Sequence, residues 1–108
     1  MALGEEFVWQ QLHLVIGVLE TKDVDGIVEA LAPRADAAYA CANGHPKSLP
    51  PERIAVACEK NRLPVRTFDS VGSALDAAED SAGDDDIILV TGSLYTVADA
   101  RRAARSIR

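Results

Sequence analysis

The chain has 108 residues, of which 11 are Lys or Arg and 17 are Asp or Glu, giving a formal net charge of −6. This balance argues against nucleic acid or an anionic membrane surface as the main partner, because both carry negative charge themselves. Hydrophobic residues make up 48% of the chain, too many for a globally disordered protein. We therefore expect a single domain over 1–108, with one core, no nucleic-acid partner and no membrane partner.

Targeting signals and cysteines point to the cytoplasm. No apolar run approaches the roughly 20 residues that span a bilayer. The first residues, MALGEEF, lack the positive region and apolar stretch of a secretory signal. Cys41 and Cys58 show no C-x-x-C spacing, which favours two small core residues in a reducing compartment over a zinc site.

The first predicted element is a strand. Residues 12–19 are almost continuously apolar and too few for a helix, which is typical of a strand covered on both faces. A helix follows, capped by Thr21 or Asp23 and ended by Pro33. Its apolar stripe consists of Val24, Ile27, Val28 and Leu31.

The same alternation continues to the end of the chain. Three further strands are expected, over 37–42, 64–68 and 87–91. A helix is expected after each of these strands. Pro50 and Pro51 open the first, and Ser70 caps the second. The apolar side of the second consists of Val71, Ala74, Leu75 and Ala78, and the third is expected from about Ser93 to Arg105. Strand and helix alternating four times predict a mostly parallel sheet with helices on its faces, a Rossmann-like three-layer sandwich.

The candidate functional residues follow the strands. Ligands of such sheets bind beyond the carboxyl ends of the strands, where 20–23, 43–47 and 91–93 fall. Gly92 permits a sharp bend or a close ligand, and Ser93 can cap a helix or hydrogen-bond an anion. A turn with its cap explains this pair without a ligand. A solvated ion pair with a cap likewise explains Lys22 and Asp23, so both interpretations stay open.

Other polar residues fit structural roles. His45 is expected in an exposed loop, and His13 in a strand with its ring hydrogen-bonded locally. The acidic run 84–86 lies at the amino end of the last strand, so we expect it to form a solvated loop. One of its aspartates is a candidate to protect the start of that strand. Neither G-x-x-x-x-G-K-[ST] nor G-x-G-x-x-G occurs, and no complete active site is visible.

Two segments carry a family resemblance. VIGVLETKD at 15–23 and ILVTGSLYTVADARR at 88–102 resemble the C-terminal domain of folylpolyglutamate synthase/dihydrofolate synthase, in the Mur ligase superfamily. That family has a strand like V-x-G-x-L-x-x-K-D and a closing G-S-L-Y-x-V-x-x-x-R. The resemblance runs from about Gly4 to Arg102, and its closing motif is the more specific of the two.

The resemblance implies an ATP-dependent amide ligase. ATP would phosphorylate a folate or pteroate carboxylate, the amine of glutamate would attack the acyl phosphate, and Mg²⁺ would neutralise the phosphoryl charge. Gly92 and Ser93 would face the cleft toward a P-loop domain, near the nucleotide. Lys22 and Asp23 would lie near the phosphates or the incoming glutamate. ATP and Mg²⁺ would belong to the parent enzyme, and neither is expected to bind tightly to this chain.

Two departures from the family shape the remaining expectations. The P-loop domain is absent, and so is the D-G-A-H-N-P segment that opens the family's domain. We expect 1–11 to be the remnant of the preceding helix, the first strand to be missing, and the chain to be inactive alone. A central strand lost from the sheet would leave unpaired backbone groups, which favours a homodimer through an exposed sheet edge.

Two alternatives to a ligase fragment remain. One is a stand-alone Rossmann-like module that binds a nucleotide or another anion without catalysis. The other is a protein-interaction domain in which Gly92 and Ser93 are a turn and a cap.

Overall fold

The computed structural model describes residues 10–92 and Thr96. Its strands are β1 (Leu12–Ile16), β2 (Ala37–Cys41), β3 (Val65–Phe68) and β4 (Ile87–Thr91). Its helices are α2 (Val24–Leu31), the short 3₁₀ helix η1 (Ala32–Arg34), α3 (Pro51–Lys60) and α4 (Val71–Ser81). The described strands form one four-stranded sheet in the order β3-β2-β1-β4, and all the pairings are parallel.

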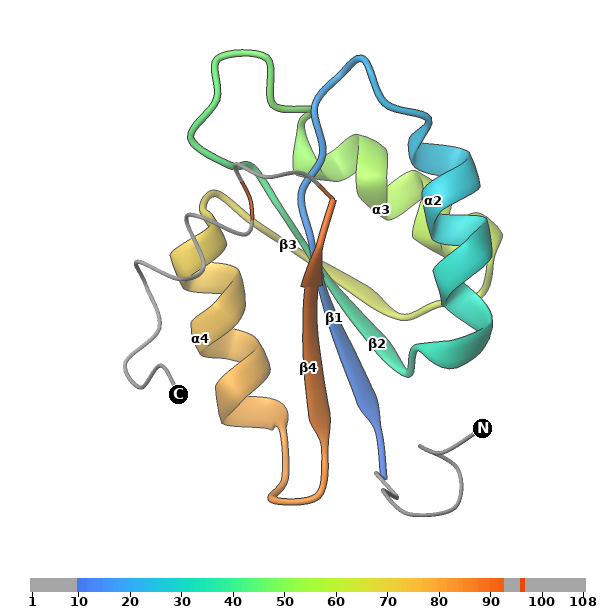
Figure 1. Cartoon of the computed structure of the whole chain (residues 1–108), viewed down its shortest axis with the longest axis vertical. Helices are drawn as coiled ribbons and strands as arrows, with labels where there is room; N and C mark the ends of the chain where they lie inside the picture. Colours follow the sequence, from blue (N-terminus) through green and yellow to red (C-terminus); the bar gives the residue numbers. More distant parts are fainter. Residues whose placement is uncertain (1–9, 93–95, 97–108) are drawn as a thin grey trace.

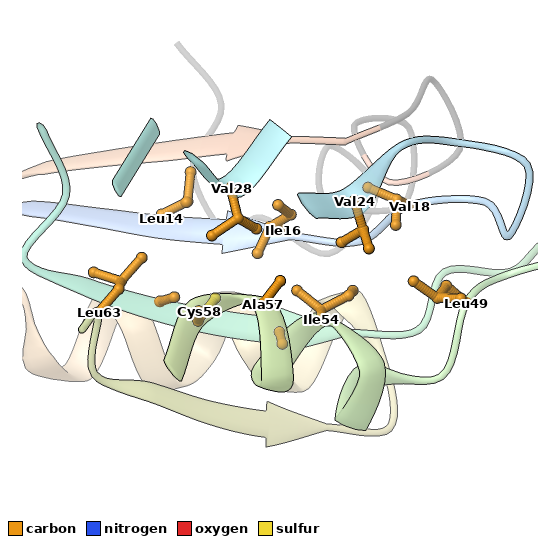
Figure 2. Close-up of a cluster of buried hydrophobic side chains, with 12 residues drawn as sticks. Leu14, Ile16, Val18, Val24, Val28, Leu49, Ile54, Ala57, Cys58 and Leu63 are labelled. Atoms are coloured by element: carbon orange, nitrogen blue, oxygen red, sulfur yellow. The ribbon is translucent and has the colours of Figure 1, made fainter. Parts of the chain in front are cut away.

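Helices cover both faces of this sheet, which confirms the predicted three layers. Figure 1 shows α2 and α3 on one side of the strands and α4 on the other. One core cluster, drawn in Figure 2, joins Leu14 and Ile16 of β1 to α2 and α3. A second cluster joins Val15 of β1 to α4. Successive residues of β1 therefore pack into the two clusters in turn, because successive side chains of a strand point to opposite faces of the sheet.

Strand β1 is shorter than the apolar run 12–19 that predicted it. All five residues of β1 are buried, as expected for a strand covered on both faces. The strand ends at Ile16 because the chain then leaves the sheet. Leu49 donates its backbone N–H to the Val18 carbonyl at 2.8 Å, and Leu19 forms an isolated antiparallel bridge with Ser48.

The predicted start of α3 and the predicted cap and apolar stripe of α4 are confirmed. Ser70 Oγ accepts from the Ser73 backbone N–H at 3.1 Å and caps α4. The predicted stripe of α4, Val71, Ala74, Leu75 and Ala78, is buried throughout. Pro51 is the first residue of α3. The helix predicted over 93–105 lies outside the described residues.

The cysteines are the buried core residues that their spacing predicted. Neither cysteine forms a disulfide, and neither has exposed surface. Burial, with a smaller contribution from the Glu59 carboxylate, raises the pKa of Cys58 to about 11. The thiol is therefore protonated at neutral pH and unreactive.

The expected gap at the centre of the sheet is absent from the described strands. β1 and β2 hold the two central positions, and each has a paired strand on both sides. The open edges belong to β3 and β4 instead. No helix of 10–92 is both long enough and apolar enough to cross a membrane.

Candidate functional site

The strand order reverses between β1 and β4, which makes their carboxyl ends the place where such sheets bind ligands. From β1 the chain crosses to β2 over one face, and from β3 it returns to β4 over the other. Directly beyond the strand ends, Gly17 donates its N–H to the Thr91 carbonyl at 3.2 Å. The segments after β1 and β4 are thus side by side, as predicted.

Gly92 is required by the fold at this point. Its φ is +123°, a conformation that residues with a side chain rarely adopt. A Cβ added there would lie 1.9 Å from the carbonyl oxygen of Gly17 and 3.0 Å from a methyl of Val18. The position therefore excludes a side chain because of the protein's own backbone. A close ligand is not needed to explain the glycine.

Asn43, in the predicted segment 43–47, and Thr96, which the sequence did not single out, close the gap between these strand ends. The Thr96 hydroxyl, fully buried, donates to the Gly17 carbonyl at 2.6 Å. The Thr96 hydroxyl oxygen also accepts a hydrogen bond from Asn43 Nδ2 at 3.0 Å. Asn43 Oδ1 in turn accepts from the His45 backbone N–H at 2.9 Å. These bonds join the segments after β1, β2 and β4, so a ligand must lie outside this layer of side chains.

The turn after β1 and the loop after β2 are also paired. Besides the bridge at Leu19, the Glu20 backbone N–H donates to the Lys47 carbonyl at 2.9 Å. The loop is closed by Asn43, whose backbone N–H donates to Ser48 Oγ at 2.9 Å. All three predicted strand-end segments therefore meet at one edge of the sheet. His45 is half-buried in this loop, and its Nδ1 accepts from the Lys47 backbone N–H, so it is less exposed than predicted.

Asp23 acts as a helix cap. Asp23 Oδ1 accepts from the Gly26 backbone N–H at 3.1 Å, which confirms the cap interpretation and excludes Thr21. Asp23 also lines a shallow hollow of about 490 Å³ whose walls are Asp23, Asp25, Gly26, Glu29, Lys60 and Asn61. Lys22 is exposed beside it. Within 10–92, no hydrogen bond or ion pair links Lys22 or Asp23 to Gly92. Their proximity to a ligand stays a prediction, and Ser93 lies outside the described residues.

Asp23→Ala is expected to lower the free energy of unfolding by about 1 kcal/mol, because an orphan N–H of α2 loses its acceptor. Asp23→Asn supplies a comparable cap and is expected to restore the stability, as measured by urea denaturation. A role in ligand binding beyond the cap requires the carboxylate charge. It would be revealed by an asparagine variant that is stable but impaired in binding.

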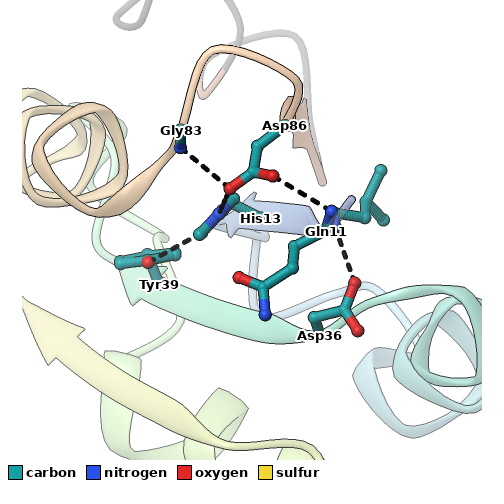
Figure 3. Close-up of polar contacts among 7 residues, drawn as sticks. Gln11, His13, Asp36, Tyr39, Gly83 and Asp86 are labelled. Carbon is teal, nitrogen blue, oxygen red and sulfur yellow. Dashed lines mark hydrogen bonds and ion pairs between the residues drawn. The ribbon is translucent and has the colours of Figure 1, made fainter. Parts of the chain in front are cut away.

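The amino edge of the sheet holds a separate polar network, drawn in Figure 3. His13, buried in β1, bonds through Nδ1 to the Tyr39 hydroxyl and through Nε2 to Asp86 Oδ2, both at 2.9 Å. An ionised Asp86 only accepts, so Nε2 donates to it, and Nδ1 of a neutral ring accepts from Tyr39. The prediction that the His13 ring is hydrogen-bonded is confirmed, but its partners are not local: they lie 26 and 73 positions away. Tyr39 lies on the neighbouring strand β2 and Asp86 directly precedes β4, so the network ties three segments of the sheet together.

Asp86 holds the start of β4 in place, as was predicted for one aspartate of the acidic run 84–86. Its Oδ2 accepts from the Gly83 backbone N–H at 2.9 Å, and its Oδ1 accepts from the Gln11 backbone N–H at 3.1 Å. Asp84 and Asp85 are exposed. The Gly83 N–H, together with His13 and the Gln11 N–H, lowers the pKa of Asp86 below its usual value near 3.8.

Residues 10–92 with Thr96 gather no group of three His, Cys, Asp or Glu side chains that could hold a metal ion. They also offer no glycine-rich phosphate loop. What the carboxyl edge does offer a phosphate or carboxylate is two exposed lysines, Lys22 and Lys47, beside main-chain turns. Such a site could contribute to a nucleotide cleft shared with another domain.

The fold and this edge define a class: a doubly wound α/β domain with its ligand edge at the reversal of strand order. Within that class the assignment is specific. Residues 2–94 match the family described as Mur ligase, glutamate ligase domain, and the chain belongs to that family. The family suggested by the two sequence segments is confirmed.

The similar proteins are named as folylpolyglutamate synthases. The chain is 37% identical over 114 residues to the dihydrofolate synthase/folylpolyglutamate synthase of Mycobacterium tuberculosis, covering 92% of this chain and 23% of that protein. The chain thus spans under a quarter of that curated relative.

Solved structures agree with this likeness. The M. tuberculosis folylpolyglutamate synthase complexed with ADP and AMPPCP superposes with a TM-score of 0.81 at 36% identity, over 98% of this chain and 26% of that one. A bifunctional folylpolyglutamate synthase/dihydrofolate synthase with Mn, AMPPNP and L-glutamate bound gives a TM-score of 0.77 at 28% identity, over 86% and 22%.

Proposed function

We propose that the chain is the C-terminal domain of an ATP-dependent ligase that adds L-glutamate to folate or dihydropteroate through an acyl phosphate, in the cytoplasm. The main support is the match over 98% of the chain to an enzyme whose structure holds ADP and AMPPCP. The paired strand-end segments supply a second argument, because they form a ligand edge of the type that nucleotides use.

The chain's own residues would provide one wall of the nucleotide cleft. ATP, when bound, supplies the phosphoryl group that activates the folate carboxylate. Lys22 would neutralise phosphate or glutamate charge from the turn after β1, and Asp23 would keep that turn in place as the cap of α2. Gly92 would hold the exit of β4 against Gly17, and Ser93 would face the nucleotide. Mg²⁺ would belong to the parent ligase.

The partners follow from the same proposal. A P-loop domain must supply the phosphate cradle that this chain lacks. Folate and glutamate would be substrates of the assembled enzyme, and the chain alone would neither ligate nor bind nucleotide tightly. We further propose that isolated chains pair as homodimers through one of the two open sheet edges, those of β3 and β4.

A domain exchange tests the ligase assignment. The segment of the M. tuberculosis relative that aligns with this chain is replaced by the chain, and ADP release is measured with folate or dihydropteroate and glutamate present. We expect ATP turnover that depends on both substrates. Lys22→Ala in the chimera is expected to reduce kcat/KM roughly tenfold or more, as loss of a charged contact to a reacting group does.

Arg34→Ala is the matched control, because Arg34 is also an exposed basic residue but lies in η1, ahead of the amino end of β2. It is expected to leave the rate unchanged. A folded chimera without substrate-dependent turnover would argue against the ligase assignment. The alternative of a stand-alone nucleotide module predicts stabilisation of the chain alone by ATP, about 2.7 kcal/mol at one hundred times the Kd.

A further inference from the structure

The edge strand β4 has the sequence of an interior strand. Its residues Ile-Ile-Leu-Val-Thr are apolar on both faces, which is typical of parallel strands that are covered on both sides. Yet four of its five residues are only half-buried, and Leu89 at its centre is 38% exposed. The equally apolar β1 is buried throughout. The strand therefore carries more apolar surface than its described neighbours cover.

The backbone of β4 has one free side within the described sheet. Ile87 donates its N–H to the Gln11 carbonyl at 3.0 Å, and the Thr91 carbonyl accepts from Gly17, so these residues turn their polar groups toward β1. Because direction alternates along a strand, Ile88 and Val90 turn theirs away from β1. Among the described strands, only β1 neighbours β4.

Within 10–92, the described helices leave the β4 edge uncovered on both faces. α4 packs mainly on β1, β2 and β3, and only Ile88 and Val90 of β4 reach the core beneath it. Leu89 is in register with Leu14 and so shares the face covered by α2 and α3. It is nevertheless exposed, because those helices lie over the other strands (Figure 1).

The opposite edge is protected. β3 reads Val-Arg-Thr-Phe, and Arg66 holds its guanidinium 5.2 Å from the Phe68 ring centroid. A charge on an edge strand opposes pairing with another copy, and β4 carries none over its five residues. With a net charge of −6 on each copy, an uncharged strand is where two copies can approach.

We propose that a second copy of this chain occupies the β4 edge, with the two β4 strands antiparallel about a two-fold axis through the Leu89 pair. A two-fold axis perpendicular to the sheet makes identical strands antiparallel and keeps equivalent faces together. Ile88 then exchanges both backbone hydrogen bonds with Val90 of the second copy, and each Leu89 covers the other. This proposal rests on the homodimer of the proposed function and assigns it to one strand and one register. If the dimer does not form, the ligase assignment is unaffected.

A cysteine at the axis tests the register. Leu89 faces its equivalent as a non-hydrogen-bonded pair, in which Cα atoms are about 4.5 Å apart, a spacing that a disulfide can bridge. Under mild oxidation, Leu89→Cys is expected to convert most of the 108-residue chain into a covalent dimer on a non-reducing gel. Cys41 and Cys58 are buried and do not compete. Val56→Cys, at an exposed apolar residue of α3, is the matched control and should stay monomeric on the gel.

Sedimentation equilibrium tests the association itself. The unmodified chain is expected to sediment as a dimer at tens of micromolar, and more completely at higher salt, which screens the repulsion between acidic copies. Val90→Pro removes an N–H that points away from β1, so it should give a monomer with an unchanged far-UV circular dichroism spectrum. A monomeric unmodified chain, or a Leu89→Cys variant that crosslinks no faster than Val56→Cys, would overturn the proposal.

Discussion

Gly92→Ala is expected to lower the free energy of unfolding by about 3 kcal/mol or more, a large part of the stability of a small domain. The added methyl would lie 1.9 Å from the Gly17 carbonyl oxygen, and φ at this residue is +123°. The obstructing carbonyl cannot swing away, because it accepts the buried Thr96 hydroxyl at 2.6 Å. Chemical denaturation followed by circular dichroism measures the loss.

Gly83→Ala is the matched control for this change. A methyl at Gly83 would find its nearest neighbour, Asp86 Oδ2, at 3.8 Å, which is ordinary contact. That variant is expected to be neutral or stabilised by roughly 0.5 kcal/mol, since alanine restricts the unfolded chain. If Gly92→Ala were as stable as Gly83→Ala and only weakened nucleotide binding, the glycine would serve ligand approach and not the fold.

The layers of this fold were predictable from local pattern. The stripe Val71, Ala74, Leu75 and Ala78 identified α4 because a helix can bury residues only at that spacing. Strand limits were less predictable. The run through Leu19 stays apolar beyond the end of β1 because Val18 and Leu19 remain packed against the segment around Ser48, outside the sheet. Continuous hydrophobicity reports burial and does not report pairing.

The candidate site was predictable only in part. Parallel topology correctly brought the segments after β1, β2 and β4 to one edge. The bond from Asn43 to Thr96 spans 53 positions, and no local pattern indicates such a partner. A usable signal did exist: Asn43 directly follows a buried strand, where an amide side chain needs partners. The expected gap at the centre of the sheet was wrong, because the general order of doubly wound sheets does not reveal that β4 pairs directly with β1.

Asp86→Asn is expected to lower the melting temperature by about 5 °C or more at neutral pH. The carboxylate accepts three hydrogen bonds, from Gly83, Gln11 and His13. An asparagine has one acceptor oxygen, so its NH₂ group must face at least one of these donors. Either the buried His13 ring or one of the backbone N–H groups then faces an NH₂ group in place of an acceptor, and the bonds that remain lose the strength that the negative charge gave them.

The pH dependence separates this carboxylate from its neighbours in the acidic run. Because the pKa of Asp86 is lowered on folding, its contribution is fully present above the usual value near 3.8 and is lost as the pH falls through the folded-state pKa. The melting temperature of the unmodified chain should therefore fall toward that of Asp86→Asn as the pH is lowered below about 4. Asp84→Asn, the same change at an exposed position, should follow the unmodified chain throughout. Parallel curves for Asp86→Asn and the unmodified chain would show that the carboxylate is not held by this network.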